Sequence, residues 1–377
     1  MEDAPEVVRV LGCHLLRRLS VKRPADDHVL VCPFGVVAVL SLAMAGAQRS
    51  TEREMAGALL TKVPQFHKSM RRLLVLPSPG SPPPEEEHHV FRMANRILLT
   101  STLPLTDSFR KIGERVYRTL VSQANFSQRA GEERRLIEMW AECATGVRGV
   151  LPASCSLDAS TRMVLLSVVW LNTLWKHGFQ RPTATRRPFD GSAAWVTTMC
   201  NTATYGYACL QEPALSAVDL PLMCDGFSVT ILLPQTSLNE LCESITSEVL
   251  QQVFEAVGRT RRRVRLELPK FTAAFETELG DVLRDLGIRE AFTDEANFRT
   301  VTRATPVSLT WVVHKLELSV NEGVSPTVMS AARGNSERDA AAPHELEFLV
   351  NRPFVICVRK LDILVLLGCV RRIQEAR

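Results

Sequence analysis

The sequence predicts one mixed α+β domain that spans residues 1–377. Three observations favour this fold class. Segments with helical apolar spacing alternate with short strand-like runs in the first half, and long apolar strands dominate the C-terminal part. The chain also has no internal repeat and no polar linker with an apolar core on each side, although 377 residues could form two domains.

The overall composition is that of an ordinary globular protein, with 46% apolar and 23% charged residues. A net charge of +4 without a dominant basic patch gives little support for nucleic-acid binding. The N-terminal segment Met1–Pro5 is acidic, and no apolar stretch follows it directly. We therefore expect no signal peptide and a cytoplasmic location, with the extracellular space as the alternative.

An uncharged stretch, Val29–Ala47, is nearly long enough to cross a bilayer. Pro33 and Gly35 interrupt its start, and small residues crowd its end. The end of a strand followed by a buried helix that begins after Pro33 fits this pattern better than a membrane span. We expect no contact with a membrane.

The other elements follow from apolar periodicity. Thr106 or Asp107 is a suitable N-cap for the helix predicted at Leu105–Tyr117. Helices are predicted at Glu52–Leu60, Lys68–Leu76, Leu105–Tyr117, Glu132–Thr145 and Leu238–Ala256, and strands at Val90–Leu99, Val164–Leu171, Phe227–Pro234, Arg263–Leu268, Leu309–Val320 and Phe354–Val370.

The composition changes abruptly between Pro77 and His89, where proline, glutamate and serine dominate. Because proline lacks the N–H donor that helices and sheets need, we predict a solvated loop between helices at residues 77–89. His88 and His89 are neighbours in an extended segment, so they cannot converge on one metal ion.

The ten cysteines are dispersed and include no C-x-x-C pair, which argues against a zinc site. Cys32, Cys209, Cys357 and Cys369 lie in apolar runs, where a free thiol behaves as a small buried hydrophobe. Buried free thiols are therefore favoured over a disulfide framework, which suits a reducing compartment. We expect no metal and no other cofactor.

The sequence motifs that would indicate an enzyme are absent. There is no phosphate-binding loop, no dinucleotide-binding glycine pattern, no G-x-S-x-G and no H-E-x-x-H. His344 and Glu345 begin like the last motif, but the second histidine is missing. We predict that the protein is not an enzyme.

A run of arginines is the densest basic feature: Arg259, Arg261, Arg262 and Arg263. It could hold a polyanion, or it could be a solvated helix-to-strand connection, which we favour. Asn125 begins a glycosylation sequon that matters only in the secretory pathway.

The order of motifs along the chain resembles that of the serpins. The resemblance extends from about Leu16 to Val370, nearly the whole chain, and is closest to intracellular or viral members that lack a signal peptide. The matching segments are Val31–Phe34, Thr51–Leu59, Ala94–Arg96, Trp140 with Thr145 and Gly149, Trp175 with Phe179, Asp219–Pro221, Leu266–Phe271, Leu279–Phe292, His314–Lys315, Val320–Gly323, Asn351–Phe354 and Leu364–Gly368.

This resemblance implies a large central β-sheet, two smaller sheets, about nine helices and an exposed reactive-centre loop at residues 323–344. It also implies a monomer that offers the loop to a protease as a substrate. After cleavage the loop inserts into the main sheet and carries the acylated protease with it.

Two alignments with the family place the scissile bond differently. Counting forward from the hinge glutamate, which matches Glu322, places Arg338 before the bond and favours a trypsin-like protease. Counting back from Pro353, by comparison with a cytoplasmic poxviral member, places Asp339 before Ala340 and favours a caspase or granzyme B. Glu337 is a third alternative.

The hinge departs from the family pattern of small residues. It reads Glu322, Gly323, Val324, Ser325 and Pro326, with Val328 and Met329 beyond. Pro326 has no N–H and is poorly tolerated in a central strand, so it should slow insertion. A non-inhibitory serpin that acts as a decoy substrate or binding protein is therefore the alternative to an inhibitor.

The region where the main sheet parts is also altered. Cys32 and Gly35 stand where the family usually has serines, and Ser167 stands where it has asparagine. His314 remains from that hydrogen-bonded cluster. Loss of the usual donors should change the free energy of opening by roughly a few kcal/mol at most, in a direction that the sequence leaves open.

Overall fold

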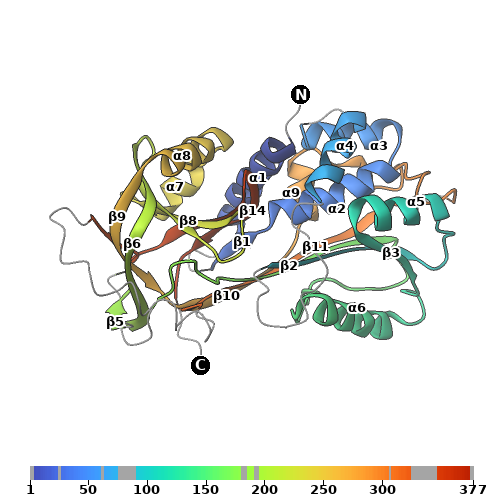
Figure 1. The fold of residues 1–377 in the computed structure, drawn as a ribbon. Coiled ribbons are helices and arrows are strands. Elements are labelled where there is room, and N and C mark those ends of the chain that lie inside the picture. The colour runs from blue at the N-terminus through green and yellow to red at the C-terminus, as the bar shows by residue number, and fades with distance from the viewer. Residues whose placement is uncertain are drawn as a thin grey trace.

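Two β-sheets and the helices that cover them form the protein in a computed structural model (Figure 1), which describes residues 4–23, 27–60, 63–74, 91–179, 185–190, 195–304, 307–323 and 346–373. Within these residues there are nine α-helices, as the resemblance implies. They are α1 (Ala4–Lys22), α2 (Pro33–Gly46), α3 (Arg49–Ala58), α4 (Val63–Leu73), α5 (Asp107–Ile112), α6 (Ala130–Thr145), α7 (Leu238–Ser244), α8 (Ser247–Arg259) and α9 (Gly280–Asp285).

The central sheet has five strands in the order β10-β11-β4-β2-β3. The pairs β10–β11 and β4–β2 are antiparallel, whereas β11–β4 and β2–β3 are parallel. The strands are β2 (Phe91–Thr100), β3 (Thr119–Ala124), β4 (Met163–Asn172), β10 (Phe271–Glu278) and β11 (Leu309–Val320).

The second sheet has nine strands in the order β1-β14-β13-β8-β7-β6-β9-β12, and β5 also pairs with β6. Strand β6 joins two parts of this sheet, one that contains β7 and one that contains β9, because Gly206 faces both Asp219 of β7 and Arg261 of β9. These parts correspond to the two smaller sheets that were predicted. The strands are β1 (Val29–Val31), β5 (Thr185–Pro188), β6 (Trp195–Gln211), β7 (Ala214–Pro221), β8 (Phe227–Pro234), β9 (Arg261–Pro269), β12 (Leu346–Leu349), β13 (Phe354–Lys360) and β14 (Ile363–Val370).

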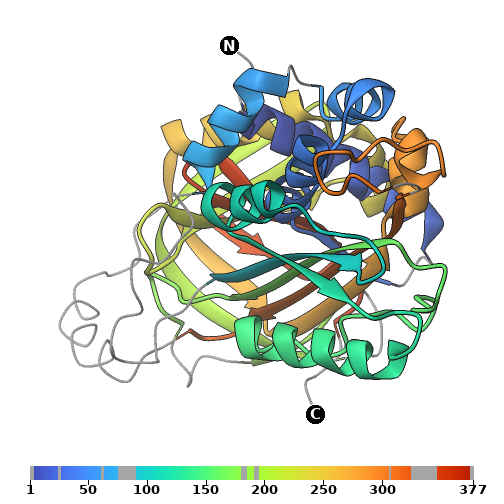
Figure 2. The ribbon, with the colours of Figure 1, turned by 90° about the vertical axis from the view of Figure 1, so that its right-hand side faces the viewer.

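Both faces of the five-stranded sheet are covered. Helix α2 lies against β4 and β2 on one face and also contacts β14 of the second sheet. Helix α6 covers the opposite face, where Ile137 and Ala141 pack against Val164, Leu166 and Val168 (Figures 1 and 2). A strand buried on both faces needs apolar residues at every position rather than at alternate ones. This explains the continuous apolar run in β4.

Helix α2 begins where the sequence predicted. Pro33 is its first residue, a position at which the missing proline N–H has no intrahelical partner to lose. Almost every residue of the helix is buried. None of the helices in the described part of the chain is long and apolar enough to span a bilayer.

The predicted single helix Leu238–Ala256 is wrong, since two helices occupy this region. Helix α7 ends at Ser244, Ile245 has an extended backbone, and Thr246 caps α8 by accepting a hydrogen bond from the Val249 N–H. Apolar spacing continues across the break because Ile245 is itself buried. Periodicity therefore did not reveal the interruption, although the Thr246 cap is a local signal for it.

Other differences concern a cysteine and the elements that the periodicity did not show. Cys209 is exposed, so the prediction that it is buried is wrong: it lies on β6, where side chains alternate between faces. Cys32, Cys357 and Cys369 are buried as expected. The longest helix, α1, and the longest strand, β6, were not predicted. The Pro-rich segment 77–89 lies outside the described residues.

Candidate functional site: the seam between β4 and β11

We call the hydrogen-bonded ladder between β4 and β11 the seam. Its parallel register runs from Leu309 opposite Met163 to Ser319 opposite Asn172, with one irregularity beside Trp311. Because the two strands are parallel, they end at the same edge of the sheet. The chain therefore leaves β11 directly beside the end of β4.

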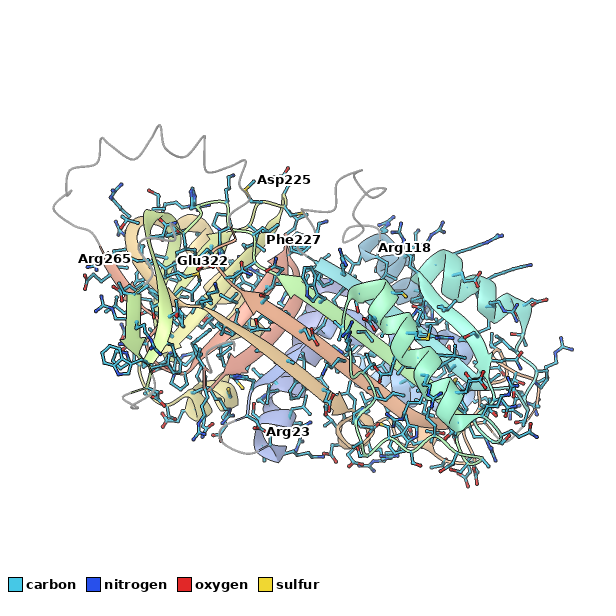
Figure 3. All side chains as sticks on the ribbon, turned by 90° about the horizontal axis from the view of Figure 1, so that it is seen from below. Arg23, Arg118, Asp225, Phe227, Arg265 and Glu322 are labelled. Carbon is cyan, nitrogen blue, oxygen red and sulfur yellow. The ribbon has the colours of Figure 1, made fainter. Side chains whose placement is uncertain are left out.

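Glu322 and Gly323 form the exit from the seam, and Figure 3 shows Glu322 at the end of β11. The Lys270 Nζ lies 2.9 Å and 3.2 Å from the two carboxylate oxygens of Glu322. The Glu322 side chain is 16% exposed and that of Lys270 is 42% exposed. The ion pair is thus partly desolvated and fastens the exit to the start of β10.

The residues after β4 are also fastened to the exit. The Trp175 Nε1 donates a hydrogen bond to the Asn321 carbonyl at 2.6 Å, and the Thr173 N–H donates to the Ser319 carbonyl at 3.0 Å. The Gly323 N–H donates to the Asn321 Oδ1 at 2.9 Å. These bonds close the edge of the seam at which the chain departs.

Gly323 occupies a position that only glycine fits. Its φ of 59° lies in the left-handed region, which L-residues rarely adopt. A Cβ at this position would lie 2.5 Å from the Thr173 carbonyl oxygen and 3.0 Å from the Trp175 N. The close approach of the two backbones at the exit therefore requires this glycine.

His314 lies in the middle of the seam, opposite Ser167, and is fully buried. Its Nε2 accepts a hydrogen bond from the Cys32 N–H at 3.0 Å, and its Nδ1 is 3.1 Å from the Ser167 carbonyl oxygen. Because the N–H of Cys32 can only donate, the proton of the neutral ring must be on Nδ1. One imidazole thus links the seam to the start of α2.

Burial sets the charge state of this cluster. It lowers the pKa of His314 to about 4, against the smaller opposite effect of the hydrogen bond to Ser167. Burial also raises the pKa of the Cys32 thiol to about 12. The Cys32 Sγ accepts a hydrogen bond from the Gly35 N–H at 3.3 Å, so the thiol serves as the N-cap of α2. The cluster is uncharged at neutral pH.

Two buried oxygens beside His314 have no hydrogen-bond partner among the described residues. They are the Ser167 Oγ and the Asn95 Oδ1. The Asn95 Nδ2 donates to the Gly35 carbonyl at 3.3 Å. An unsatisfied buried polar group costs about 1–3 kcal/mol, so these two oxygens weaken the closed seam.

Gly35 is fitted closely to this cluster. A Cβ on Gly35 would lie 2.6 Å from the Ser167 Oγ and 3.2 Å from the Met93 Sδ. A larger residue at this position would therefore displace the Ser167 hydroxyl. The two departures from the family pattern, at 35 and 167, are in direct steric contact.

The structure thus brings some of the predicted site residues together. Cys32, Gly35, Ser167 and His314 meet in one cluster, while Glu322 and Gly323 lie eight and nine residues after His314, just beyond the end of β11 and roughly 26 Å away at the usual rise of a strand. Asn95 was missed as a member, although it lies in one of the matching segments. Val324, Ser325, Pro326, Glu337, Arg338, Asp339 and Ala340 lie outside the described residues.

The arginine run lies at the start of β9, in the second sheet. Arg259 forms an ion pair with Glu255 one turn back in α8, at 3.0 Å. Arg261 and Arg262 are exposed. Farther along the strand, Arg265 pairs with Glu347 of β12 at 2.9 Å (Figure 3). Nearby acids therefore offset part of this basic charge.

Comparison with known proteins identifies the family to which the chain belongs. The family model described as Serpin (serine protease inhibitor) matches residues 6–371. This chain belongs to the serpin family. The predicted family and the predicted serpin fold are both confirmed.

Relatives of this serpin match over most of its length. Ovalbumin of Gallus gallus is 25% identical over 360 residues, which cover 89% of this chain and 90% of ovalbumin. The leukocyte elastase inhibitor of Bos taurus is 24% identical over 358 residues, which cover 92% of each protein. The crystal structure of native protease nexin-1 with heparin shares the fold, with a TM-score of 0.85 at 21% identity over 98% of this chain and 99% of that chain.

Proposed function

We propose that this serpin inhibits serine proteases by cleavage of its reactive-centre loop and insertion of the loop into the seam. The observation that carries the proposal is the parallel β4–β11 ladder, with the loop leaving from the end of β11. Parallel ladders are slightly less stable per residue than antiparallel ones. From β11, one strand of this parallel pair, the chain continues directly towards the predicted loop.

The direction of the strands gives insertion its driving force. A segment that turns back after Gly323 and enters the seam would run antiparallel to β11 and to β4. One parallel ladder would be replaced by two antiparallel ladders, so more backbone groups would be hydrogen-bonded within the sheet. The two unsatisfied oxygens at Ser167 and Asn95 would also gain new neighbours. Both effects favour the inserted form.

The protease is trapped because insertion competes with hydrolysis. The nucleophile of the protease attacks the scissile carbonyl, the amine of the next residue leaves, and the acyl-enzyme is carried along with the inserting strand. We propose Arg338 as the residue before the scissile bond, which suits a trypsin-like protease. Asp339 is the alternative and suits a caspase or granzyme B, with Glu337 as a third position.

The second candidate function is a non-inhibitory serpin that acts as a decoy substrate or binding protein. Pro326 supports it, because it follows Gly323 closely and would enter the seam early. Its missing N–H would remove a ladder hydrogen bond from the new central strand. Slow insertion would allow the protease to complete hydrolysis and dissociate.

A panel of proteases distinguishes the two functions. The full chain is mixed with trypsin, granzyme B and a caspase, and the products are separated in SDS and mapped by mass spectrometry. A stable covalent complex, with cleavage after Arg338 or Asp339, supports inhibition. Cleavage without a complex, followed by no rise in the melting temperature, supports the non-inhibitory function and contradicts insertion.

A Pro326→Ala variant serves as the matched comparison. If the proline limits insertion, this variant should form more covalent complex per cleavage event than the unmodified chain. An unchanged ratio for Pro326→Ala would show that the hinge proline does not control the outcome.

We propose two further properties. The cysteines are all free in the structure, which favours action in a reducing cytoplasm, as a monomer of the intracellular kind. The exposed Arg261 and Arg262 would contact a polyanion such as the heparin present in the structure of protease nexin-1. Heparin affinity chromatography of an Arg261→Ala/Arg262→Ala variant tests this contact.

A further inference from the structure

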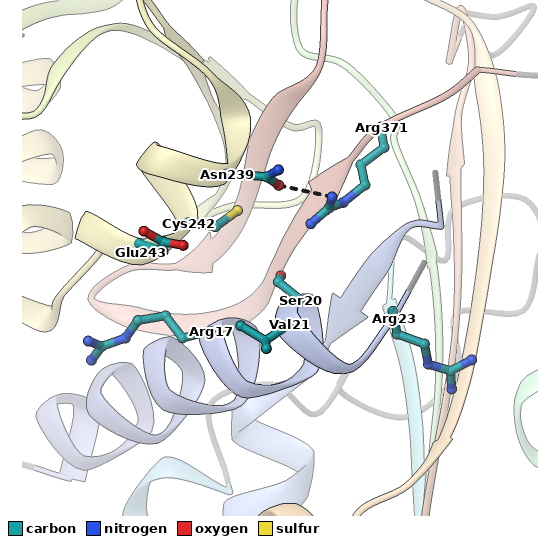
Figure 4. A pocket seen from close by; sticks show the side chains of 8 residues that line it. All are labelled: Arg17, Ser20, Val21, Arg23, Asn239, Cys242, Glu243 and Arg371. Carbon is teal, nitrogen blue, oxygen red and sulfur yellow. Dashed lines mark hydrogen bonds between the residues drawn. The ribbon is translucent and has the colours of Figure 1, made fainter. Parts of the chain in front are cut away.

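A small cavity opens between α1, α7 and the segment that follows β14 (Figure 4). Its volume is about 200 Å³, and Ser20, Cys242 and Arg371 contribute to its lining from these three elements. Arg371 donates a hydrogen bond to the Asn239 Oδ1 at 3.0 Å. None of the residues that line the cavity belongs to β4 or β11, and the cavity plays no part in the function proposed above.

The sulfur of Cys369 is fully buried behind the Ser20 and Cys242 side chains that line this cavity, and hydrogen-bonding groups surround it. The Ser20 Oγ is 3.6 Å away. The Cys242 thiol and the Arg371 side chain also form hydrogen bonds with the Cys369 sulfur. Three donors around one buried sulfur stabilise the thiolate over the thiol.

The electrostatics agree with this geometry. The hydrogen bond from Cys242 and the charge of Arg371 hold the pKa of Cys369 below its usual range, although burial opposes them. The pKa of Cys242 is raised, mainly because its proton is shared with Cys369.

We propose that Cys242 and Cys369 form a dithiol site that reacts with small peroxides and closes to a disulfide. Cys242 itself lines the cavity, where an oxidant can reach it, and the lining Ser20 hydroxyl lies 3.6 Å from the sulfur of Cys369, the hydrogen-bond partner of Cys242. Hydrogen peroxide is small enough for this space. The product would link α7 covalently to β14.

The reaction balances as a two-electron oxidation. The Cys369 thiolate attacks one peroxide oxygen, an S–O bond forms, the O–O bond breaks, and the leaving hydroxide takes a proton and becomes water. The Cys242 sulfur then attacks the Cys369 sulfenic acid and releases a second water. Two thiols are oxidised to one disulfide, and one peroxide is reduced to two waters.

Cys13 and Cys357 provide an internal comparison. These two thiols are also buried and close enough to affect each other electrostatically, but neither lines this cavity. Burial raises the pKa of Cys13 to about 12 and also raises that of Cys357. Two neighbouring thiols without donors and without an approach for the oxidant should remain reduced.

The test treats the folded full chain with hydrogen peroxide, then unfolds it with a thiol-alkylating reagent and maps non-reduced peptides by mass spectrometry. We expect a Cys242–Cys369 linked peptide at peroxide concentrations that leave Cys13 and Cys357 reduced. In a Cys242→Ser variant the resolving thiol is missing, so Cys369 should be trapped as a sulfenic-acid adduct with dimedone. Absence of the linked peptide, together with no adduct at Cys369 in that variant, would overturn the proposal.

A Ser20→Ala variant tests the role of the donors. It should slow disulfide formation several-fold and move the pH midpoint of the rate upward, because one donor to the thiolate is lost. An unchanged rate and pH midpoint would contradict the role assigned to Ser20. Arg371 is the charged side chain that acts on both thiols of the pair. Arg17 of α1 and Glu243 of α7 also line the cavity, Arg23 is turned away and donates to the Glu276 carbonyl, and the His28 Nδ1 accepts a hydrogen bond from the Arg371 N–H.

Discussion

Two strand pairs in this serpin are buried to a similar extent and differ in their hydrogen bonding. One is the seam between β4 and β11, and the other is the hairpin of β13 and β14. All eight residues of β14 are buried, as are eight of the ten residues of β4. The hairpin is antiparallel and joined by a tight turn at Leu361, whereas the seam is parallel and joins strands that are distant in sequence.

The buried polar groups differ between the two regions. The hairpin carries apolar residues and a cysteine at its centre, and its Arg359 has a buried Nε without a hydrogen-bond partner among the described residues, although the Nη2 of the same side chain donates to the Asp219 Oδ1 at 2.9 Å. The seam has a histidine and a serine at its centre, and the Ser167 Oγ and the nearby Asn95 Oδ1 of β2 have no partner among the described residues. The two pairs therefore differ in strand direction and in the kind of polar group at their centres, and not in the burial of apolar area.

The largest losses of stability are expected from substitutions that leave a cavity, and these losses should be equal in the two regions. Leu366 of β14 and Leu166 of β4 are both fully buried. Replacing either with alanine should reduce the free energy of unfolding by about 3 kcal/mol, through lost transfer energy and the cavity that remains. Urea unfolding of both variants measures this. A much smaller loss for Leu166→Ala would show that the two regions are not equally packed.

Acid should weaken the seam and leave the hairpin unchanged. The pKa of His314 is about 4 in the folded protein and near 6.5 when unfolded, so its contribution to stability is present above pH 6.5 and is lost as the pH falls towards 4. Between pH 7 and pH 5 we expect a loss of about 2 kcal/mol. Unfolding of the unmodified chain and of His314→Gln over this range gives the difference due to this ring. Parallel curves for the two proteins would contradict the assignment.

Steric coupling between positions 35 and 167 should be measurable. Gly35→Ala places a Cβ 2.6 Å from the Ser167 Oγ, so it should destabilise the protein by about 1–3 kcal/mol. Ser167→Ala alone removes an unsatisfied buried hydroxyl and should be nearly neutral or slightly stabilising. The double variant should recover much of the loss. Additive effects in this double-mutant cycle would mean that the two side chains do not interact.

The smallest effect concerns the ion pair at the exit. Glu322→Gln should cost at most about 1 kcal/mol, since Lys270 remains partly solvated. The loss should appear as faster hydrogen exchange at the end of β11. Glu276→Gln is the matched control. Glu276 forms an ion pair with Lys315 at an N–O distance of 3.2 Å, and this pair does not involve the exit. Equal acceleration at the end of β11 in both variants would argue against a specific role for Glu322.

Much of the fold was predictable from local patterns. The continuous apolar run at Val164–Leu171 indicates a strand that is covered on both faces, and the structure shows β4 between α2 and α6. The elements that were missed, α1 and β6, have weaker signals. Helix α1 has a charged residue, Arg9, among its buried positions, and β6 switches between two neighbouring strands at Gly206. Neither feature produces a regular apolar period.

The sequence by itself indicated the family and the residues that depart from the family pattern, because both depend on residue identity and order. Only the tertiary structure decided that His314 bonds to Cys32, 282 positions away, and that Asn95 and Ser167 keep unsatisfied oxygens beside it. Hydrogen-bond partners across a sheet depend on which strands lie side by side and in which register. Local periodicity fixes the face on which a side chain lies, and the partner that it meets there follows from the topology of the whole chain.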